Sequence, residues 1–185
     1  MEKNTQKNLI KTSRFLSKHL RHAPQEIGLT LEPGGWVPVS DLLEACRRAR
    51  VFLDRELLEQ IVFENDKQRF AFDESGDRIR ANQGHSTSVD LQLEPVKPPF
   101  TLFHGTASKN IASILETGII RGSRHHVHLS QDAETARKVG ARHGKPVILK
   151  VQSRAMRDAG FVFFQSENNV WLTDHVPAEF LILEP

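Results

Sequence analysis

Apolar residues in the first half of the chain recur at helical spacing in three places, with polar residues between them. This pattern predicts three helices, because residues three and four apart share one helix face. They cover residues 6–21, 41–50 with Ser40 as N-cap, and the residues after the N-cap Asp54. The alternating stretches 69–72 and 78–81 predict a strand pair joined by a turn at 73–76. With a short strand at 36–39, this element order is typical of a winged helix.

The pattern changes after a stretch rich in Ser, Thr, Gly and Pro. Residues 84–99 contain three prolines, and we interpret 87–99 as a linker. Strands predominate beyond it, and two helices lie among them. The strands are predicted over 101–104, 127–130, 147–151, 170–173 and 180–183. One helix is predicted over 108–117, with Ser108 as its cap and Gly118 at its end, and another over 132–139. The sequence therefore predicts an α+β protein in two parts, 1–86 and 100–185.

Composition excludes several classes of protein. The 185 residues are 38% hydrophobic and carry a net charge of +2, which is too apolar for a disordered chain. No apolar run approaches the roughly 20 residues of a membrane span. The N-terminus has no apolar core, so we expect no signal peptide. Cys46 is the single cysteine, which excludes a disulfide framework and favours a cytoplasmic location.

Positive charge gathers in two stretches of the chain. Residues 1–22 carry six Lys and Arg against one Glu, and residues 121–157 carry nine against two acidic residues. Two such stretches suit a polyanion such as RNA or a phosphorylated substrate. The simpler interpretation is a pair of solvated helix faces, and charge alone favours it.

Two segments of the first half carry residues suited to phosphate chemistry. Arg21 and His22 close the first predicted helix, where cations also stabilise the unpaired carbonyls of a helix end. Together they can hold a phosphate and move a proton. Arg69 follows a polar turn at 65–68, and an ion pair with a neighbouring carboxylate is its simpler interpretation.

The third candidate segment, 121–130, contains Arg124 and a histidine cluster. His125, His126 and His128 invite a zinc interpretation. On a strand, however, His126 and His128 share one face while His125 points away, and no thiolate or acidic pair completes a tetrahedron. We therefore expect no metal site.

Two further features fit the binding of a small molecule. His104, Gly105 and Thr106 are predicted where a strand turns into a helix, so that glycine lets a ligand approach and the helix offers free N–H groups. Residues 166–172 place polar groups before a buried strand, for which an ordinary turn is the simpler interpretation. No Walker loop, G-x-G-x-x-G, H-E-x-x-H or G-x-S-x-G occurs, which disfavours P-loop, Rossmann, zincin and hydrolase chemistry.

In their order along the chain, these segments resemble a known family. The matching motifs are Ser13 to Pro24, Asn65 to Phe70, Ile79 to Ser86, Phe103 to Thr106, Arg124 to Ser130, Asn168 to Thr173, and Val176-Pro177. The set resembles the NAD-dependent RNA 2′-phosphotransferases, also called tRNA 2′-phosphotransferases, from about residue 10 to the C-terminus. The strings R-A-N-Q-G-H-S and R-x-H-V-H are its most specific parts.

The resemblance implies an N-terminal winged-helix lobe (1–86) that binds the RNA 2′-phosphate and a C-terminal ADP-ribosyltransferase-like lobe (100–185) that binds NAD, with the active site between them. The implied catalytic set is Arg21, His22, Arg69 and Arg124. The implied NAD-binding residues are His104, Gly105, Thr106, His128, Asn169 and Val170. Asn169 stands where family members often have Gly, and Val170 where many ADP-ribosyltransferases have a catalytic Glu.

The resemblance further implies a two-step reaction. An internal RNA 2′-phosphate attacks the anomeric carbon of the nicotinamide ribose of NAD, and nicotinamide leaves. The ribose 2″-hydroxyl then attacks that phosphorus, giving 2′-OH RNA and ADP-ribose 1″,2″-cyclic phosphate. We expect NAD as a co-substrate, no metal, 2′-phosphorylated tRNA-like RNA as the partner, and a monomer that binds no membrane.

Two other functions stay open from the sequence. A winged-helix regulator would bind nucleic acid through the first basic stretch and would need no NAD. An enzyme of the same fold would ADP-ribosylate phosphate ends of nucleic acids and stop after the first step. Nicotinamide release distinguishes the regulator from the enzymes, and ADP-ribose that persists on the nucleic acid distinguishes the two enzymes.

Overall fold

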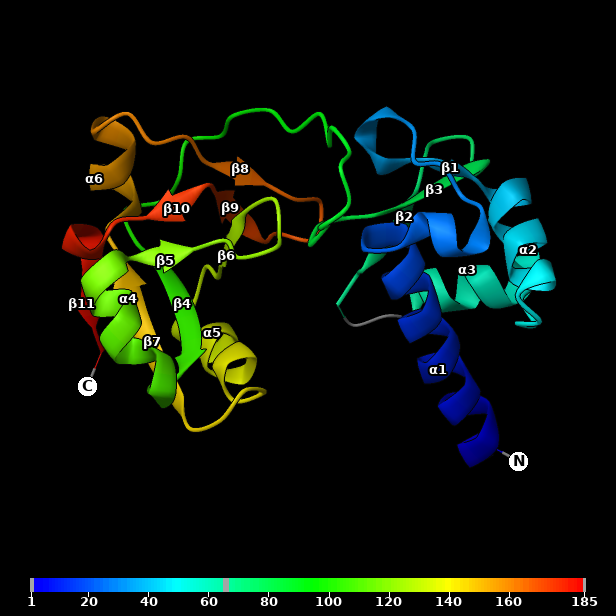
Figure 1. Ribbon diagram of the computed structural model, residues 1–185, viewed down its shortest axis with the longest axis horizontal. Helices are drawn as coiled ribbons and strands as arrows, with labels where there is room; N and C mark the ends of the chain where they lie inside the picture. Colours follow the sequence, from blue (N-terminus) through cyan, green and yellow to red (C-terminus); the bar gives the residue numbers. More distant parts are fainter. Residues whose placement is uncertain (1, 65–66, 185) are drawn as a thin grey trace. The chain divides into compact units, whose positions relative to one another are not determined.

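The computed structural model describes residues 2–64 and 67–184, and the chain divides into two compact units (Figure 1). Unit 1 is Met1–Gln92 and unit 2 is Leu93–Pro185. The division falls within the stretch that the sequence suggests as a linker. Asn65 and Asp66, which begin the second of the motifs above, lie outside the described residues.

Unit 1 builds one apolar core from helices and a small antiparallel sheet. The helices are α1 (Glu2–Arg21), α2 (Val39–Arg48) and α3 (Arg55–Phe63), with 3-10 turns η1 (Pro24–Ile27) and η2 (Pro33–Gly35). The sheet has the order β1 (Val37–Pro38), β3 (Arg78–Ala81), β2 (Phe70–Phe72). Leu16 and Leu20 of α1, Leu42 of α2, Leu58 of α3 and Ile79 of β3 are fully buried together.

The predicted helices of unit 1 are present. Of the two N-caps predicted for them, one is confirmed and the other is wrong. Asp54 caps α3 as predicted, since its carboxylate accepts a hydrogen bond of 2.8 Å from the N–H of Leu57. Ser40 as the N-cap of α2 is wrong, because α2 begins at Val39 and Ser40 lies inside it. The N–H of Val39 donates to the carbonyl of Asp77 at 2.8 Å, so the helix start needs no side-chain cap.

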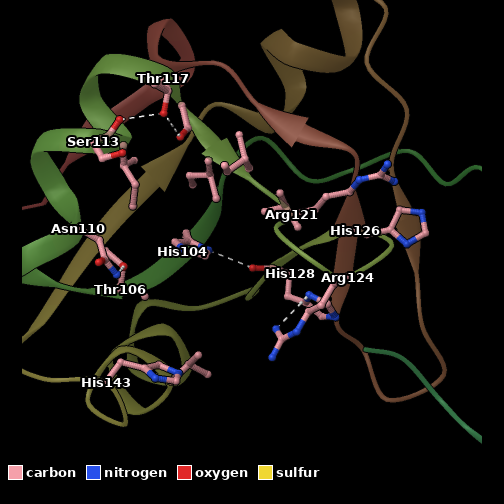
Figure 2. Close-up of a pocket in the computed structure, with 17 residues that line it drawn as sticks. His104, Thr106, Asn110, Ser113, Thr117, Arg121, Arg124, His126, His128 and His143 are labelled. Carbon is pink, nitrogen blue, oxygen red and sulfur yellow. Dashed lines mark hydrogen bonds between the residues drawn. The ribbon is translucent and has the colours of Figure 1, made fainter. Parts of the chain in front are cut away.

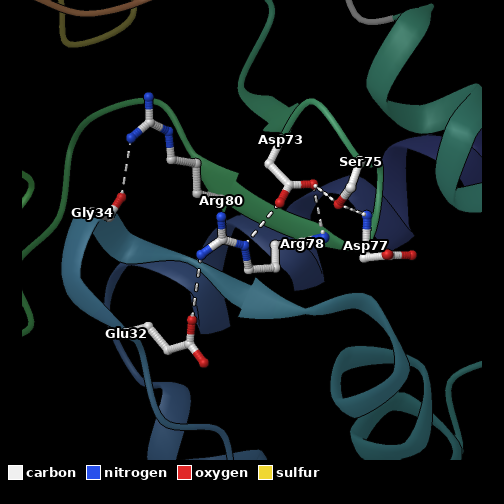
Figure 3. Close-up of polar contacts among 7 residues, drawn as sticks. All are labelled: Glu32, Gly34, Asp73, Ser75, Asp77, Arg78 and Arg80. Atoms are coloured by element: carbon white, nitrogen blue, oxygen red, sulfur yellow. Dashed lines mark hydrogen bonds and ion pairs between the residues drawn. The ribbon is translucent and has the colours of Figure 1, made fainter.

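The predicted turn at 73–76 is held by one carboxylate (Figure 3). Asp73 accepts hydrogen bonds from the Ser75 hydroxyl at 3.0 Å and from Nε of Arg78 at 2.8 Å. The bond from the Arg78 side chain is the main cause that lowers the pKa of Asp73 to about 2. The guanidinium groups of Arg78 and Arg80 lie 5.5 and 4.4 Å from the Trp36 ring centroid, so the hairpin also packs on the residue before β1.

Unit 2 surrounds a second apolar core with three small antiparallel sheets. Their orders are β11 (Leu181–Leu183), β7 (Pro146–Val151), β4 (Leu102–Ala107); β6 (Val127–Leu129), β9 (Trp171–Thr173), β8 (Phe164–Gln165); and β10 (His175–Val176), β5 (Ile119–Ile120). The helices are α4 (Ile111–Thr117), α5 (Ala133–Gly140) and α6 (Ser153–Asp158), with 3-10 turns η3 (Ser108–Asn110) and η4 (Ala178–Phe180). A bridge between Phe103 and Ser130 connects β4 to the end of β6.

The mixture of helices and small sheets agrees with the α+β prediction, while some boundaries in unit 2 differ. Gly118 ends α4 as predicted, and the helix predicted over 132–139 is present as α5, with Asp132 as its N-cap. Ser108 as a helix cap is wrong, because it begins the 3-10 turn η3 and α4 starts only at Ile111. No helix in the part of the chain that the structure describes is long and apolar enough to cross a membrane.

Candidate functional site

A pocket of about 370 Å³ opens in unit 2 beside β4, α4 and β6 (Figure 2). Its polar lining combines histidines, arginines and neutral hydrogen-bonding side chains: His104, Thr106, Asn110, Ser113, Thr117, Arg121, Arg124, His126, His128 and His143. Of the NAD-binding residues that the resemblance implies, His104, Gly105, Thr106 and His128 line this pocket, as does Arg124 of the implied catalytic set.

His104 is held in one tautomer by the backbone of β6. Its Nδ1 lies 3.1 Å from the carbonyl oxygen of His128, which can only accept, so Nδ1 carries the proton. Burial is the main cause that lowers the pKa of His104, and the positive charge of Arg124 lowers it further. The ring is therefore neutral at pH 7, and its Nε2 is available as a hydrogen-bond acceptor.

The basic side chains of the pocket are ordered by the segment between β5 and β6. Nη1 of Arg121 donates to the carbonyl of His125 at 2.9 Å, which fixes the guanidinium across the loop. Nη1 of Arg124 lies 3.5 Å from Nδ1 of His128. These arginines stay protonated at every working pH, so the pocket has a permanently cationic side that suits an anionic ligand.

Gly105 and Thr106 lie inside a strand rather than where a strand turns into a helix, which corrects the prediction. β4 continues to Ala107, so no helix N-terminus offers N–H groups at Thr106. A Cβ on Gly105 would lie 1.7 Å from the carbonyl oxygen of Ala136 in α5. The glycine is therefore needed for close packing of α5 on β4. Gly105 also lines the pocket, and the approach of a ligand to its backbone stays a prediction.

The hydroxyl of Thr106 is positioned by a side chain that the sequence did not single out. Nδ2 of Asn110, in the turn η3, donates to Oγ1 of Thr106 at 3.1 Å. Both residues line the pocket, so a ligand there meets a hydroxyl with a defined orientation. Arg121 and His143 were also missed as lining residues; only Arg121 had a signal, because it begins the histidine-rich segment.

Asn169 and Val170 lie in a tight turn before β9 and are not part of the pocket lining. Asn169 has φ of 60°, the left-handed conformation that glycine adopts most easily and asparagine tolerates. The N–H of Val170 donates to the Ser166 hydroxyl at 3.1 Å, and its carbonyl accepts from the Ser166 N–H at 3.0 Å. The asparagine thus satisfies the backbone geometry of the turn.

In unit 1 the structure brings together three residues of the implied catalytic set. Arg21 ends α1, and its Nη2 donates to the backbone carbonyl of Arg69 at 3.2 Å, next to β2. His22 follows on the surface, with Nδ1 2.9 Å from the hydroxyl of Ser86. The N–H of Ser86 in turn donates to the carbonyl of Arg21 at 2.9 Å. A helix end, a strand start and the segment after β3 therefore bring Arg21, His22 and the backbone of Arg69 together.

The histidines of β6 and of the segment before it lie in different surroundings. His126 and His128 line the pocket, whereas His125 does not. The His126 ring packs 5.4 Å from the Phe164 ring centroid, and burial is the main cause that lowers its pKa. Within 2–64 and 67–184, no three His, Cys, Asp or Glu residues are grouped closely enough to hold a metal ion.

The lowered pKa values of His104 and His126 predict a loss of stability in acid. Below about pH 6.5 the unfolded chain binds protons that the folded chain excludes, so the unfolding free energy falls with pH down to the folded-state values. His104→Gln keeps an N–H donor for the His128 carbonyl but does not titrate. We expect a smaller fall in unfolding free energy between pH 7.5 and 5.5 in this variant.

Denaturant titrations followed by Trp171 fluorescence measure this effect in unit 2. The chain has two tryptophans, and a Trp36→Phe background leaves Trp171 as the reporter. An equal fall in His104→Gln and its parent would contradict the buried, neutral state of His104.

Comparison with known proteins places the chain in one family. Residues 7–175 match the family model described as RNA 2′-phosphotransferase, Tpt1/KptA family. Among similar proteins, the probable RNA 2′-phosphotransferase of Trichormus variabilis is 58% identical over 172 residues, covering 93% of this chain and 94% of its own. That of Herpetosiphon aurantiacus is 52% identical over 179 residues, covering 97% and 98%. The resemblance seen in the motifs is confirmed: the chain belongs to the Tpt1/KptA family of RNA 2′-phosphotransferases.

Proposed function

We propose that the protein removes an internal 2′-phosphate from RNA by transferring it to NAD, giving 2′-OH RNA and ADP-ribose 1″,2″-cyclic phosphate. Membership of the family supports the removal of the phosphate from RNA. The observation that carries the proposal is that Arg21 contacts the backbone of Arg69 while the adjacent His22 contacts Ser86, so three residues of the implied catalytic set meet in unit 1. Arginine and histidine are residue types suited to holding a phosphate. By family resemblance, Arg124, which lines the unit 2 pocket, is the fourth member of the proposed catalytic set.

The proposal includes the identity of the two parts of the chain. We interpret 1–86 as a winged-helix lobe for the RNA 2′-phosphate, 87–99 as a linker, and 100–185 as an ADP-ribosyltransferase-like lobe for NAD. In support, unit 1 has the order helix, strand, helix, helix, hairpin. We expect the enzyme to act as a cytoplasmic monomer on tRNA-like RNA.

The unit 2 pocket has groups that fit part of a dinucleotide such as NAD. Its volume of about 370 Å³ lies in the range of small-molecule sites. The unprotonated Nε2 of His104 can accept a hydrogen bond from a ribose hydroxyl, and the fixed Thr106 hydroxyl offers a further polar contact. Arg121 and Arg124 can neutralise a diphosphate. Asn169 and Val170 stay proposed as NAD-binding residues by family resemblance alone, since they do not line this pocket.

The first step needs a site that positions two substrates rather than one that removes a proton. An oxygen of the RNA 2′-phosphate forms a bond to the anomeric carbon of the nicotinamide ribose, while the bond to nicotinamide breaks. The attacking oxygen is already an anion, so no general base is required. Val170 is compatible with this chemistry, because its backbone is held by Ser166 and its side chain has no titrating group.

The second step develops charge that arginines are suited to stabilise. The ribose 2″-hydroxyl loses its proton as its oxygen forms a bond to phosphorus, and the bond to the RNA 2′-oxygen breaks as that oxygen gains a proton. Arg21, Arg69 and Arg124 stay protonated and can each contact two phosphate oxygens. His22, beside Ser86, can orient the phosphate or give the proton to the leaving oxygen.

The two roles of His22 predict different pH profiles for the second step. If His22 donates the proton, decay of preformed ADP-ribosylated RNA should vary between about pH 5 and 8, where an imidazole changes charge. His22→Asn should then give a slow, flat profile. Ser86→Ala is the matched variant, because it removes only the hydroxyl 2.9 Å from the ring and should keep the sloped profile. We expect proton donation, and a flat wild-type profile would leave orientation as the role.

Product analysis with NAD and a short RNA bearing one internal 2′-phosphate tests the proposed function. We expect nicotinamide release that depends on the 2′-phosphate, together with free cyclic phosphate. Absence of nicotinamide release despite RNA binding would favour a non-enzymatic regulator. ADP-ribose that persists on the RNA would favour an enzyme that stops after the first step.

A further inference from the structure

A second pocket lies in unit 1, and its lining includes none of the residues that the proposed chemistry uses. Its volume is about 420 Å³, and it lies between α1, the segment after α2 and the start of α3. Its lining is Asn8, Leu9, Lys11, Thr12, Phe15, Arg50, Val51, Phe52 and Leu57. No carboxylate is among these residues, so the pocket combines an apolar floor with a purely cationic rim.

Three side chains at the rim, Phe52, Lys11 and Arg50, are exposed to solvent and free to contact a ligand. Phe52 is 78% exposed, although burial of an aromatic ring is favourable. Lys11 and Arg50 are exposed, and within the described part of the chain neither side chain has an ion pair or hydrogen bond. Other exposed arginines of unit 1, such as Arg47 and Arg55, pair with glutamates, whereas the two cations of this pocket do not.

The backbone holds this rim in a defined conformation. Arg50 has φ of 57°, a left-handed conformation that costs a non-glycine residue energy. It is maintained by the reversal after α2, where the N–H of Val51 donates to the carbonyl of the buried Cys46 at 2.9 Å. Phe52 therefore follows a fixed turn and does not belong to a loose loop.

We propose that this pocket binds a nucleobase of the RNA substrate, separate from the reacting 2′-phosphate. Phe52 stacks on the base, and Lys11 and Arg50 contact the phosphates on either side. An exposed aromatic ring next to unpaired cations is the arrangement by which proteins bind single-stranded RNA without reading its sequence. The inference rests on RNA being the substrate, as in the proposed function.

Helix geometry gives the expected distance between the base and the reacting phosphate. Thr12 at the pocket and Arg21 at the end of α1 are separated by nine residues, or about 14 Å along the helix axis. A stacked strand rises about 3.4 Å per nucleotide, so the base lies about four nucleotides from the 2′-phosphate. A trinucleotide is too short to occupy both places.

Equilibrium binding of 2′-phosphorylated RNA without NAD tests the proposal. The wild type should bind an RNA with about eight nucleotides on each side of the phosphate more tightly than a trinucleotide. Phe52→Ala should raise the Kd of the long RNA roughly 5- to 150-fold, the range that base–aromatic stacking gives, and should reduce the gain from length by the same factor. Lys11→Gln and Arg50→Gln should weaken the salt dependence of binding.

Phe63→Ala is the matched control, because Phe63 lies in the same unit, is 77% exposed and does not line the pocket. It should bind both RNAs like the wild type. Removing single bases from the long RNA, one position at a time, identifies the stacked base. Its removal and Phe52→Ala should not be additive, since both abolish one contact.

Equal binding of the long RNA by Phe52→Ala and Phe63→Ala would overturn the proposal, as would additive effects at every abasic position. Nicotinamide release with the trinucleotide reports on the proposed function separately. If that release occurs while length brings no gain in affinity, the base-binding site is wrong and the activity stands. If length and Phe52 govern binding but no nicotinamide is released, the site stands and the proposed function is wrong.

Discussion

Arg69→Ala and Arg124→Ala should each slow the second step by about 10²- to 10³-fold, the usual loss when one donor to a developing oxyanion is removed. The first step should be less affected, because it consumes an existing phosphate anion and the arginines serve there mainly in binding. RNA carrying ADP-ribose on its 2′-phosphate should therefore accumulate in both variants. Single-turnover reactions with labelled RNA, resolved by electrophoresis, separate the two steps.

Exposed arginines outside the candidate sites provide matched controls. Arg47 lies on α2 and pairs with Glu44 at 2.8 Å, and Arg142 lies on the surface after α5. Arg47→Ala and Arg142→Ala remove the same charge from each unit and should leave both steps near wild-type rates. If Arg69→Ala and Arg124→Ala turn over like these controls, with no intermediate seen, both catalytic assignments are wrong.

Gly105→Ala should destabilise unit 2 by about 3 kcal/mol or more, because the added Cβ meets backbone that cannot rotate away. The new atom would lie 1.7 Å from the carbonyl oxygen and 2.5 Å from the carbonyl carbon of Ala136. α5 would have to move off β4, at a place where Ala136 is fully buried. Denaturant titration followed by Trp171 fluorescence in a Trp36→Phe background measures the loss.

Substitutions at two other glycines provide comparisons, and both should cost less stability than Gly105→Ala. A Cβ on Gly140, which faces β4 from α5, would lie 2.8 Å from the Thr106 carbonyl, so Gly140→Ala should cost less than Gly105→Ala. Gly122 has φ of 62° with nothing near its Cβ position, so Gly122→Ala reports the cost of the left-handed backbone alone, about 1 kcal/mol. Gly105→Ala with wild-type stability would contradict the packing of α5 on β4.

Long elements with strong local signals could be predicted from the sequence. α3 follows from Asp54 and its apolar stripe, in which Leu58, Ile61 and Val62 are buried. The start of α2 could not be predicted, because the group that satisfies the N–H of Val39 is the carbonyl of Asp77, distant in sequence. The strands β5, β8 and β10 have two residues each, too few for any periodicity.

In the candidate site too, residues in local motifs could be predicted from the sequence, whereas contacts made by the fold could not. Arg21, His22 and Arg69 stand in recognisable motifs, and the left-handed Asn169 fits a residue type that tolerates this backbone. The contact of Ser86 with His22 depends on how the segment after β3 returns to the end of α1. The packing role of Gly105 could not be predicted, since only the structure shows that a Cβ at this position would meet the backbone of α5.

Transfer of phosphorus from RNA to ADP-ribose is the most direct test of the account. An RNA with radioactive phosphorus only in its internal 2′-phosphate is incubated with the protein and NAD, and all labelled products are separated. We expect the label to move to ADP-ribose 1″,2″-cyclic phosphate, with one nicotinamide released for each phosphorus transferred. Label that leaves as inorganic phosphate, or that stays on the RNA whether or not NAD is present, would contradict it.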